Sequence, residues 1–173
     1  MAARVRFLAE SYDAVGLRDI ARDAGVDVAL VSRYFGSKEE LFRIVLKGGE
    51  DAAITLPEDA AALPSFFLSL ISQGEEPGCT HSREKLMIML RSANSTAAAE
   101  VIQASFRRDV LEPLAGVIGG PSAPARAVLT MAVLIGTNFL RNVLPVTPLS
   151  AEDEVVFKLG LLRLFETALP RED

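Results

Sequence analysis

The chain has 173 residues, of which half are apolar and 24% are charged, and this composition excludes a disordered or collagen-like protein. The formal net charge is −5, yet residues 1–50 carry eight basic and eight acidic side chains, so the excess of acid lies beyond them. The single cysteine, Cys79, and the single histidine, His81, exclude an intrachain disulfide and a zinc site of four such ligands. The apolar run over residues 127–140 is shorter than the ~20 residues that span a bilayer. A soluble, cytoplasmic protein is therefore expected.

Apolar residues recur at helical spacing almost throughout, so the sequence predicts an all-α fold of about nine helices. The first three are expected over residues 2–11, 17–24 and 28–35. Gly25 is expected to end the second helix in the left-handed conformation, and Asp27 to cap the third. Residues 37–40 form a predicted capping box. It opens a fourth helix, which is expected to run past Gly48 toward Leu56.

Beyond Pro57 the spacing predicts helices over residues 59–73, from Ser82 through Leu90, over 97–118 and over 124–144. Residues 74–80 are expected to form a loop. Ser150 is predicted to cap a last helix, whose first turn is acidic. We therefore expect two domains, residues 1–47 and residues 48–173.

The two short helices joined by Gly25, Val26 and Asp27 are typical of a helix-turn-helix motif. Such a motif places its second helix in the major groove of B-DNA, with the N-terminal half toward the base edges. Arg33 is the best candidate for reading a base, because arginine pairs bidentately with guanine. The residues expected on the free face of this helix are Val28, Ala29, Ser32 and Arg33.

Two stretches are more specific than the motif alone. Residues 12–27 and residues 33–42, with their run Tyr-Phe-Gly-Ser-Lys-Glu, closely resemble the DNA-binding domain of the tetracycline-repressor (TetR) family. The resemblance covers residues 2–47, and the rest of the chain is similar to the family in its helical architecture. It implies contacts to backbone phosphates from Arg18, Tyr34 and Lys38. The alternatives are a solvated surface charge at Arg18 and Lys38, and a packed ring at Tyr34.

Several positions depart from the family pattern, and two of these departures affect the expected function. Val28, Ala29 and Leu30 are uncharged where many members have Lys-Gly-Thr, and the first helix begins about two turns late. We expect either a start upstream of Met1 or a shortened domain, in which the loss of a basic arm removes phosphate contacts. These departures favour an alternative function, a helical ligand-binding or protein-interaction bundle with a degenerate DNA-binding module.

The helix over residues 124–144 is apolar on nearly all sides, so it needs partners on both sides. A subunit interface explains this better than a monomeric core, and the resemblance implies a homodimer packed through the last two helices. Paired recognition helices would then meet the two halves of a pseudo-palindromic operator. The residues expected at the dimer interface are Ala127, Leu134, Asn138, Arg141, Val155, Leu159, Leu162 and Phe165.

The resemblance also implies that the C-terminal domain binds a small molecule, and no cofactor or metal is expected. The residues expected to line the pocket are Phe66, Phe67, Met87, Leu90, Phe106, Val110, Met131 and Asn138. The alternative for the apolar ones is an ordinary core. The expected function is a nucleoid-associated transcriptional regulator, most often a repressor in this family, whose affinity for DNA changes with the bound molecule. An enzyme is the weakest hypothesis, since the sequence lacks phosphate-binding glycine loops and nucleophile elbows.

Overall fold

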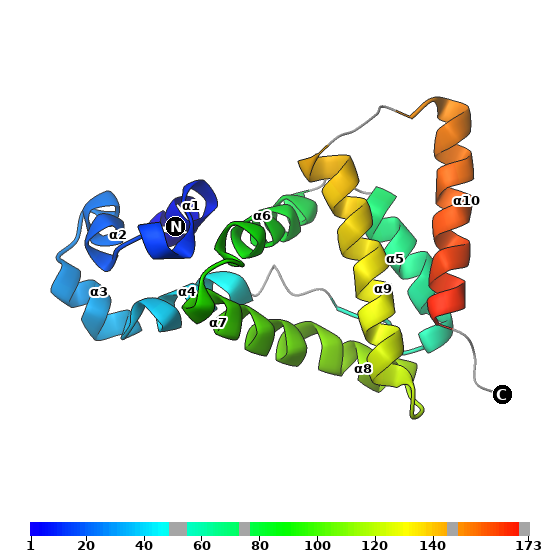
Figure 1. The fold of residues 1–173 in the computed structure, drawn as a ribbon, viewed down its shortest axis with the longest axis horizontal. Helices are drawn as coiled ribbons and strands as arrows, with labels where there is room; N and C mark the ends of the chain where they lie inside the picture. Colours follow the sequence, from blue (N-terminus) through cyan, green and yellow to red (C-terminus); the bar gives the residue numbers. More distant parts are fainter. Residues whose placement is uncertain (49–54, 73–76, 145–148, 170–173) are drawn as a thin grey trace. The chain divides into compact units, whose positions relative to one another are not determined.

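The computed structural model describes residues 1–48, 55–72, 77–144 and 149–169, with the side chains of residues 77–83 and 142 left out. Within these residues every regular element is a helix, as predicted (Figure 1). The chain forms two compact units, which we call unit 1 and unit 2. Unit 1 comprises residues 1–53 and 84–107, and unit 2 comprises residues 54–83 and 108–173.

Unit 1 begins with α1 (Ala2–Ala9), the short 3-10 turn η1 (Tyr12–Ala14), α2 (Leu17–Ala24), α3 (Val28–Phe35) and α4 (Lys38–Lys47). The bounds of α2 and α3 agree with the prediction, whereas α1 ends two residues before the predicted Ser11. The predicted extension of α4 toward Leu56 is wrong. Gly48 adopts a φ of +74° and ends the helix, even though apolar residues continue the helical spacing beyond it.

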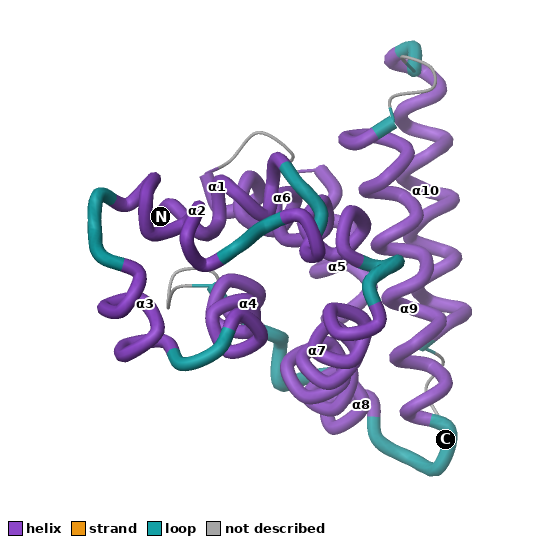
Figure 2. Tube along the Cα trace, turned by 60° about the vertical axis from the view of Figure 1, so that its left-hand side comes forward, coloured by secondary structure: helices purple, strands orange, loops and turns teal. Residues whose placement is uncertain are grey.

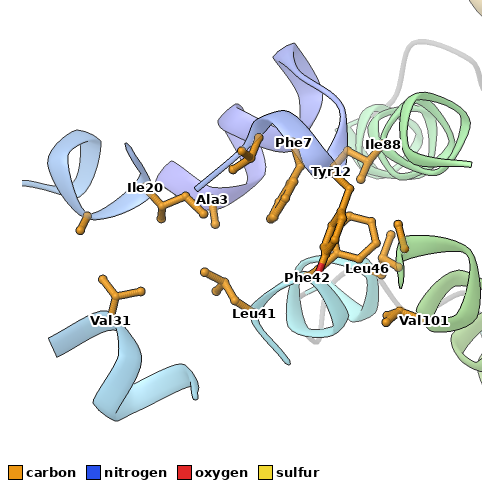
Figure 3. Close-up of a cluster of buried hydrophobic side chains, with 13 residues drawn as sticks. Ala3, Phe7, Tyr12, Ile20, Val31, Leu41, Phe42, Leu46, Ile88 and Val101 are labelled. Atoms are coloured by element: carbon orange, nitrogen blue, oxygen red, sulfur yellow. The ribbon is translucent and has the colours of Figure 1, made fainter. Parts of the chain in front are cut away.

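The core of unit 1 is a cluster of three aromatic rings (Figure 3). Phe42 packs edge-on against Phe7 and Tyr12, with ring centroids 4.9 Å apart in each pair. Ile88 on α6 (Pro77–Ser92) and Val101 on α7 (Thr96–Phe106) belong to the same cluster. Residues 84–107 therefore complete the core of the N-terminal helices.

Polar contacts attach the same segment to the N-terminal helices. The Ser95 hydroxyl donates a hydrogen bond to Asp13 Oδ1 over 2.8 Å, and Arg4 forms an ion pair with Glu84. The compact unit is thus larger than the predicted domain of residues 1–47. A single domain boundary in the sequence cannot describe unit 1, because residues 84–107 belong to it although they are distant in the chain.

Unit 2 contains the 3-10 turn η3 (Ala60–Ala62), α5 (Leu63–Ser72), α8 (Glu112–Ile118), α9 (Ala123–Asn138) and α10 (Ala151–Ala168). Two π-helical segments, η4 (Arg107–Leu111) and η5 (Phe139–Val143), continue α7 into α8 and lengthen α9. The predicted helices over 97–118 and 124–144 therefore exist, but each contains a π-helical stretch. As predicted, the Ser150 hydroxyl caps α10 by accepting from the Asp153 N–H over 3.1 Å.

The predicted start of the sixth helix is wrong. The sequence predicts a loop over residues 74–80 and a helix capped by Ser82, but α6 already begins at Pro77. Proline suits the first turn of a helix, because its missing N–H would have no partner there in any case. The side chains of Cys79 and His81 lie outside the described residues.

The core of unit 2 lies where α5, α9 and α10 pack together, and Figure 2 shows α9 and α10 side by side. Phe67 on α5 and Phe165 on α10 have ring centroids 5.5 Å apart, and both side chains are buried. Among the described helices, Ala123–Arg141 is long and apolar enough to cross a membrane. That is weak evidence for a span, because a core helix of a soluble protein passes the same test.

Candidate nucleic-acid interface

The turn between α2 and α3 is fixed by hydrogen bonds around Gly25. The Gly25 N–H donates to the Arg22 carbonyl over 3.1 Å, and the Val26 N–H donates to the Ala21 carbonyl over 3.0 Å. These are the two bonds of a Schellman motif, which needs a left-handed residue at its centre. Gly25 has φ +67° and ψ 30°, as the sequence predicts. Asp27 then caps α3 by accepting from the Ala29 N–H over 2.7 Å, which is also as predicted.

This turn leaves one side of α3 facing away from the protein. Val31 is 5% exposed and joins the core, and Val28 is half-buried against it. At about 100° per residue, Arg33 lies opposite Val31 on the helix, and Ala29 and Leu30 flank it. All three of these side chains are exposed. The face available to a partner thus includes Leu30, which the sequence analysis did not select.

The remaining residues expected on α3 are also accessible. Ser32 is exposed, and Tyr34 is 76% exposed, so its ring is not packed in the core of unit 1. Arg18, in the first turn of α2, is exposed as well. Lys38, at the start of α4, is half-buried, and its Nζ lies 4.2 Å from the centroid of the Tyr12 ring.

The basic side chains of the N-terminal helices divide into two groups. One group is neutralised: Arg22 pairs with Asp19 at 2.8 Å, Arg6 with Glu10 at 2.7 Å and with Asp23, Arg4 with Glu84, and Arg43 with Glu40. The other group has no carboxylate partner among the described residues and consists of Arg18, Arg33, Lys38 and Lys47. Three of these four, Arg18, Arg33 and Lys38, are among the residues predicted to contact DNA. Cationic side chains without an ion pair in the described part of the chain therefore lie on α2, on α3 and at the start of α4, where they are available to a phosphate backbone.

The start of α4 differs from the predicted capping box in one respect. The Ser37 hydroxyl accepts from the Glu40 N–H over 3.1 Å, but the Glu40 carboxylate pairs with Arg43. The neighbouring Glu39 carboxylate accepts from its own backbone N–H at the positive end of the helix, which lowers the pKa of its carboxyl. A negative charge therefore lies at the helix start where Lys38 is expected to meet a phosphate.

Two family models match the sequence. The model described as "Bacterial regulatory proteins, tetR family" matches residues 1–45, and the model described as "Tetracyclin repressor-like, C-terminal domain" matches residues 75–160. The chain belongs to the TetR family. Its members are DNA-binding transcriptional regulators and not enzymes.

One solved structure shares the fold of this chain. NalD of Pseudomonas aeruginosa, the secondary repressor of the MexAB-OprM multidrug efflux pump, matches with a TM-score of 0.66 and 18% identity. The match covers 99% of this chain and 94% of NalD. A mutant of HlyIIR matches with a TM-score of 0.43 and 18% identity over 98% of this chain and 94% of its own. No curated protein matches the sequence.

Burial divides the residues expected at the TetR-type dimer interface. Ala127 and Phe165 have no exposed surface and Leu134 is only 7% exposed, so these three belong to the core of unit 2. Val155 and Leu159 are 58% and 55% exposed, and Leu162 is half-buried. The two polar residues have partners within unit 2. The Asn138 amide donates to the Leu134 carbonyl over 3.2 Å, and Arg141 pairs with Glu154 at 2.9 Å.

The structure reveals an apolar face on α9 that sequence reasoning did not resolve. Opposite the buried side of this helix, one uncharged stripe is exposed. It consists of Ala125, Val128, Leu129, Ala132 and Gly136. On α10 the exposed apolar side chains are Val155, Val156, Leu159 and Leu164. Because α9 is apolar on all sides, its sequence alone does not tell which side the rest of the chain covers.

The residues expected to line a ligand pocket are divided between the two units. Phe67 and Met131 are buried in unit 2, whereas Phe66, Val110 and Asn138 are half-buried there. The other three, Met87, Leu90 and Phe106, belong to unit 1. Phe67 packs on Phe165 and has the surroundings of a core residue. A shared pocket for the eight stays a prediction.

Proposed function

We propose that this TetR-family regulator is a homodimeric repressor of transcription that binds a pseudo-palindromic operator and is released from it by a small molecule. The observation that carries the proposal is the set of unpaired cations in unit 1. Four of the eight basic residues among the first 50 are neutralised, and three of the other four are Arg18, Arg33 and Lys38. These three residues are among those predicted to contact DNA, and none of them forms an ion pair within the described residues of unit 1.

In this proposal the three cations have different tasks. Arg33, at the centre of the exposed face of α3, reaches base edges in the major groove. Arg18 and Lys38 neutralise phosphates, together with the exposed hydroxyl of Tyr34, and fix the position of α3 in the groove. Phosphate contacts make binding steeply dependent on salt, whereas base contacts decide which sequence is bound.

The homodimer is proposed from the exposed apolar stripe on α9 and the exposed apolar side chains of α10. An exposed apolar helix face is unfavourable for an isolated chain and is typical of a subunit interface. A second copy of unit 2 would cover the same stripe by twofold symmetry, which is the commonest arrangement in homo-oligomers. A twofold dimer also presents two copies of α3, as a palindromic operator requires.

Small-molecule control is proposed from family membership. An effector shifts a conformational equilibrium only by the difference between its affinities for the two states. The effector must therefore bind the form that is off DNA more tightly than the operator-bound form. Its binding site is proposed in the C-terminal region, where Phe66, Val110 and Asn138 are accessible enough to contact it.

The experiment that tests the proposal is selection of genomic DNA fragments by the purified protein at two salt concentrations. We expect a recovered pseudo-palindrome, and weaker binding at the higher salt. Removing two phosphate contacts with Arg18→Gln and Lys38→Gln should lower the slope of log affinity against log salt by about two per half-site. Arg107→Gln, which removes an exposed arginine after the end of α7, is the matched control and should leave the slope unchanged. Failure to enrich any DNA would instead support the helical ligand-binding bundle.

A further inference from the structure

We infer that Leu30 is a specificity-determining residue, and that α3 recognises a guanine through Arg33 next to a thymine whose methyl group contacts Leu30. This inference rests on the proposed function, because it names the bases that the same surface reads. It begins from the position of Leu30, which is exposed on α3 beside Arg33.

Leu30 is one of two exposed leucines in the described part of unit 1, and each of them, Leu30 and Leu90, is 43% exposed. By contrast, Leu41 and Leu46 on α4 are 4% and 1% exposed. It lies on the side of α3 that faces away from the core, beside Arg33. This side chain stays largely in contact with water when the chain folds. Burial of its apolar surface therefore contributes free energy only when a partner covers α3.

The composition of α3 restricts which bases it can read. Between Val28 and Phe35 there is no carboxylate to accept from cytosine, and no asparagine or glutamine to bind adenine bidentately. Arg33 is the one charged residue in this helix, and arginine pairs with the O6 and N7 atoms of guanine. Ser32 is compatible with several bases and adds little discrimination. The hydrogen-bonding part of the recognition is therefore one guanine in each half-site.

The apolar part of the recognition follows from the chemistry of the groove. In the major groove the 5-methyl group of thymine is the apolar feature of the base edges, and apolar side chains contact it. Ala29, on the other flank of Arg33, is small and lets the helix approach closely enough for Leu30 to reach the methyl group. Unpaired positive charge at Arg18 and Lys38 fits the phosphates on either side, so the occupant of this face is duplex DNA.

The spacing of the two contacts follows from the helix geometry. Leu30 and Arg33 are three residues apart, which is about 4.5 Å along a helix that rises about 1.5 Å per residue. Successive base pairs of B-DNA are about 3.4 Å apart. The thymine is therefore expected within about two base pairs of the guanine that Arg33 reads.

The test modifies single functional groups of the DNA bases and measures the affinity of the protein for each modified operator. Once an operator has been selected, each thymine near its guanine is replaced by uracil, which lacks only the methyl group. We expect affinity of the unmodified protein to fall about fourfold per half-site at one position, the effect of about one buried methyl group. The Leu30→Ala variant should be insensitive to that replacement. Ile44→Ala, which shortens a side chain of similar exposure on α4, is the matched control and should stay sensitive.

A parallel substitution tests the arginine. Replacing the guanine by 7-deazaguanine removes the N7 acceptor, and we expect affinity to fall about tenfold for the unmodified protein but not for Arg33→Ala. Selected operators without a thymine within two base pairs of the guanine would overturn the inference. So would specific binding that is indifferent to uracil at every position. Both results leave the proposed function standing, whereas absence of any specific binding would refute the proposed function itself.

Discussion

The left-handed glycine at the centre of the helix-turn-helix gives a prediction that separates conformation from packing. A Cβ placed on Gly25 would meet no atom within 4 Å, so Gly25→Ala adds no steric clash with the rest of the chain. The variant must nevertheless adopt φ near +67°, which costs an L-residue about 1–2 kcal/mol. Part of this cost is offset, because alanine lowers the entropy of the unfolded chain by an amount worth about 0.4–1 kcal/mol. The net loss of stability is expected to be about 1 kcal/mol.

The assay is urea unfolding followed by circular dichroism, with the slope of the transition compared between variants. Gly25→Asn should lose less stability than Gly25→Ala, since asparagine tolerates the left-handed region better. Gly116→Ala makes the same chemical change inside α8, where the glycine is helical and its Cβ would also meet no atom within 4 Å. That control should gain about 0.5–1 kcal/mol, because alanine favours the helix. Equal effects at positions 25 and 116 would refute the conformational argument.

Three further predictions follow from the ion pairs and exposed faces. Glu39→Gln removes a negative charge from the start of α4, so operator affinity should rise about twofold to fivefold in an electrophoretic mobility assay at low salt. Val128→Glu places a charge on the exposed stripe of α9 and should convert the dimer to a monomer in sedimentation velocity. The hydrogen bonds from Arg6 lower the pKa of Asp23, so this pair stabilises the fold above the unfolded pKa of about 4. The stability difference from Asp23→Asn should therefore shrink as the pH falls below that value, and a difference constant from pH 7 to pH 3 would contradict the assignment.

The parts of the fold that depend on neighbouring residues could be predicted from the sequence. Gly25 and Asp27 define the end of α2 and the start of α3 through bonds to residues at most five positions away, and both boundaries are confirmed. The end of α4 was harder to predict. Apolar residues continue the helical spacing beyond Gly48, and only its backbone conformation shows that the helix ends there.

The parts that depend on distant residues could not be predicted in this way. Nothing in the sequence around Ile88 or Val101 indicates that these side chains join the core cluster of Phe7 and Phe42. The burial of the expected interface residues could not be predicted from the sequence either. Ala127 and Val128 are neighbours in an apolar helix, and only packing shows that the first is in the core and the second is exposed. Of the candidate DNA contacts, Arg18, Tyr34 and Lys38 were selected from the family resemblance, and those on the face of α3 from the helix-turn-helix pattern. The structure adds Leu30 to these candidates.

The division of the chain into alternating segments has a consequence for protein engineering. Unit 1 is assembled from two separate stretches, residues 1–53 and residues 84–107. A chimaera that joins the first stretch to the regulatory half of a relative, with a single crossover near residue 53, would leave Phe42 facing foreign helices. Transfer of the whole of unit 1 to a relative therefore requires both of these segments. Transfer of the DNA specificity alone can instead be attempted by grafting the exposed side chains of α3, which leaves the core of the recipient protein unchanged.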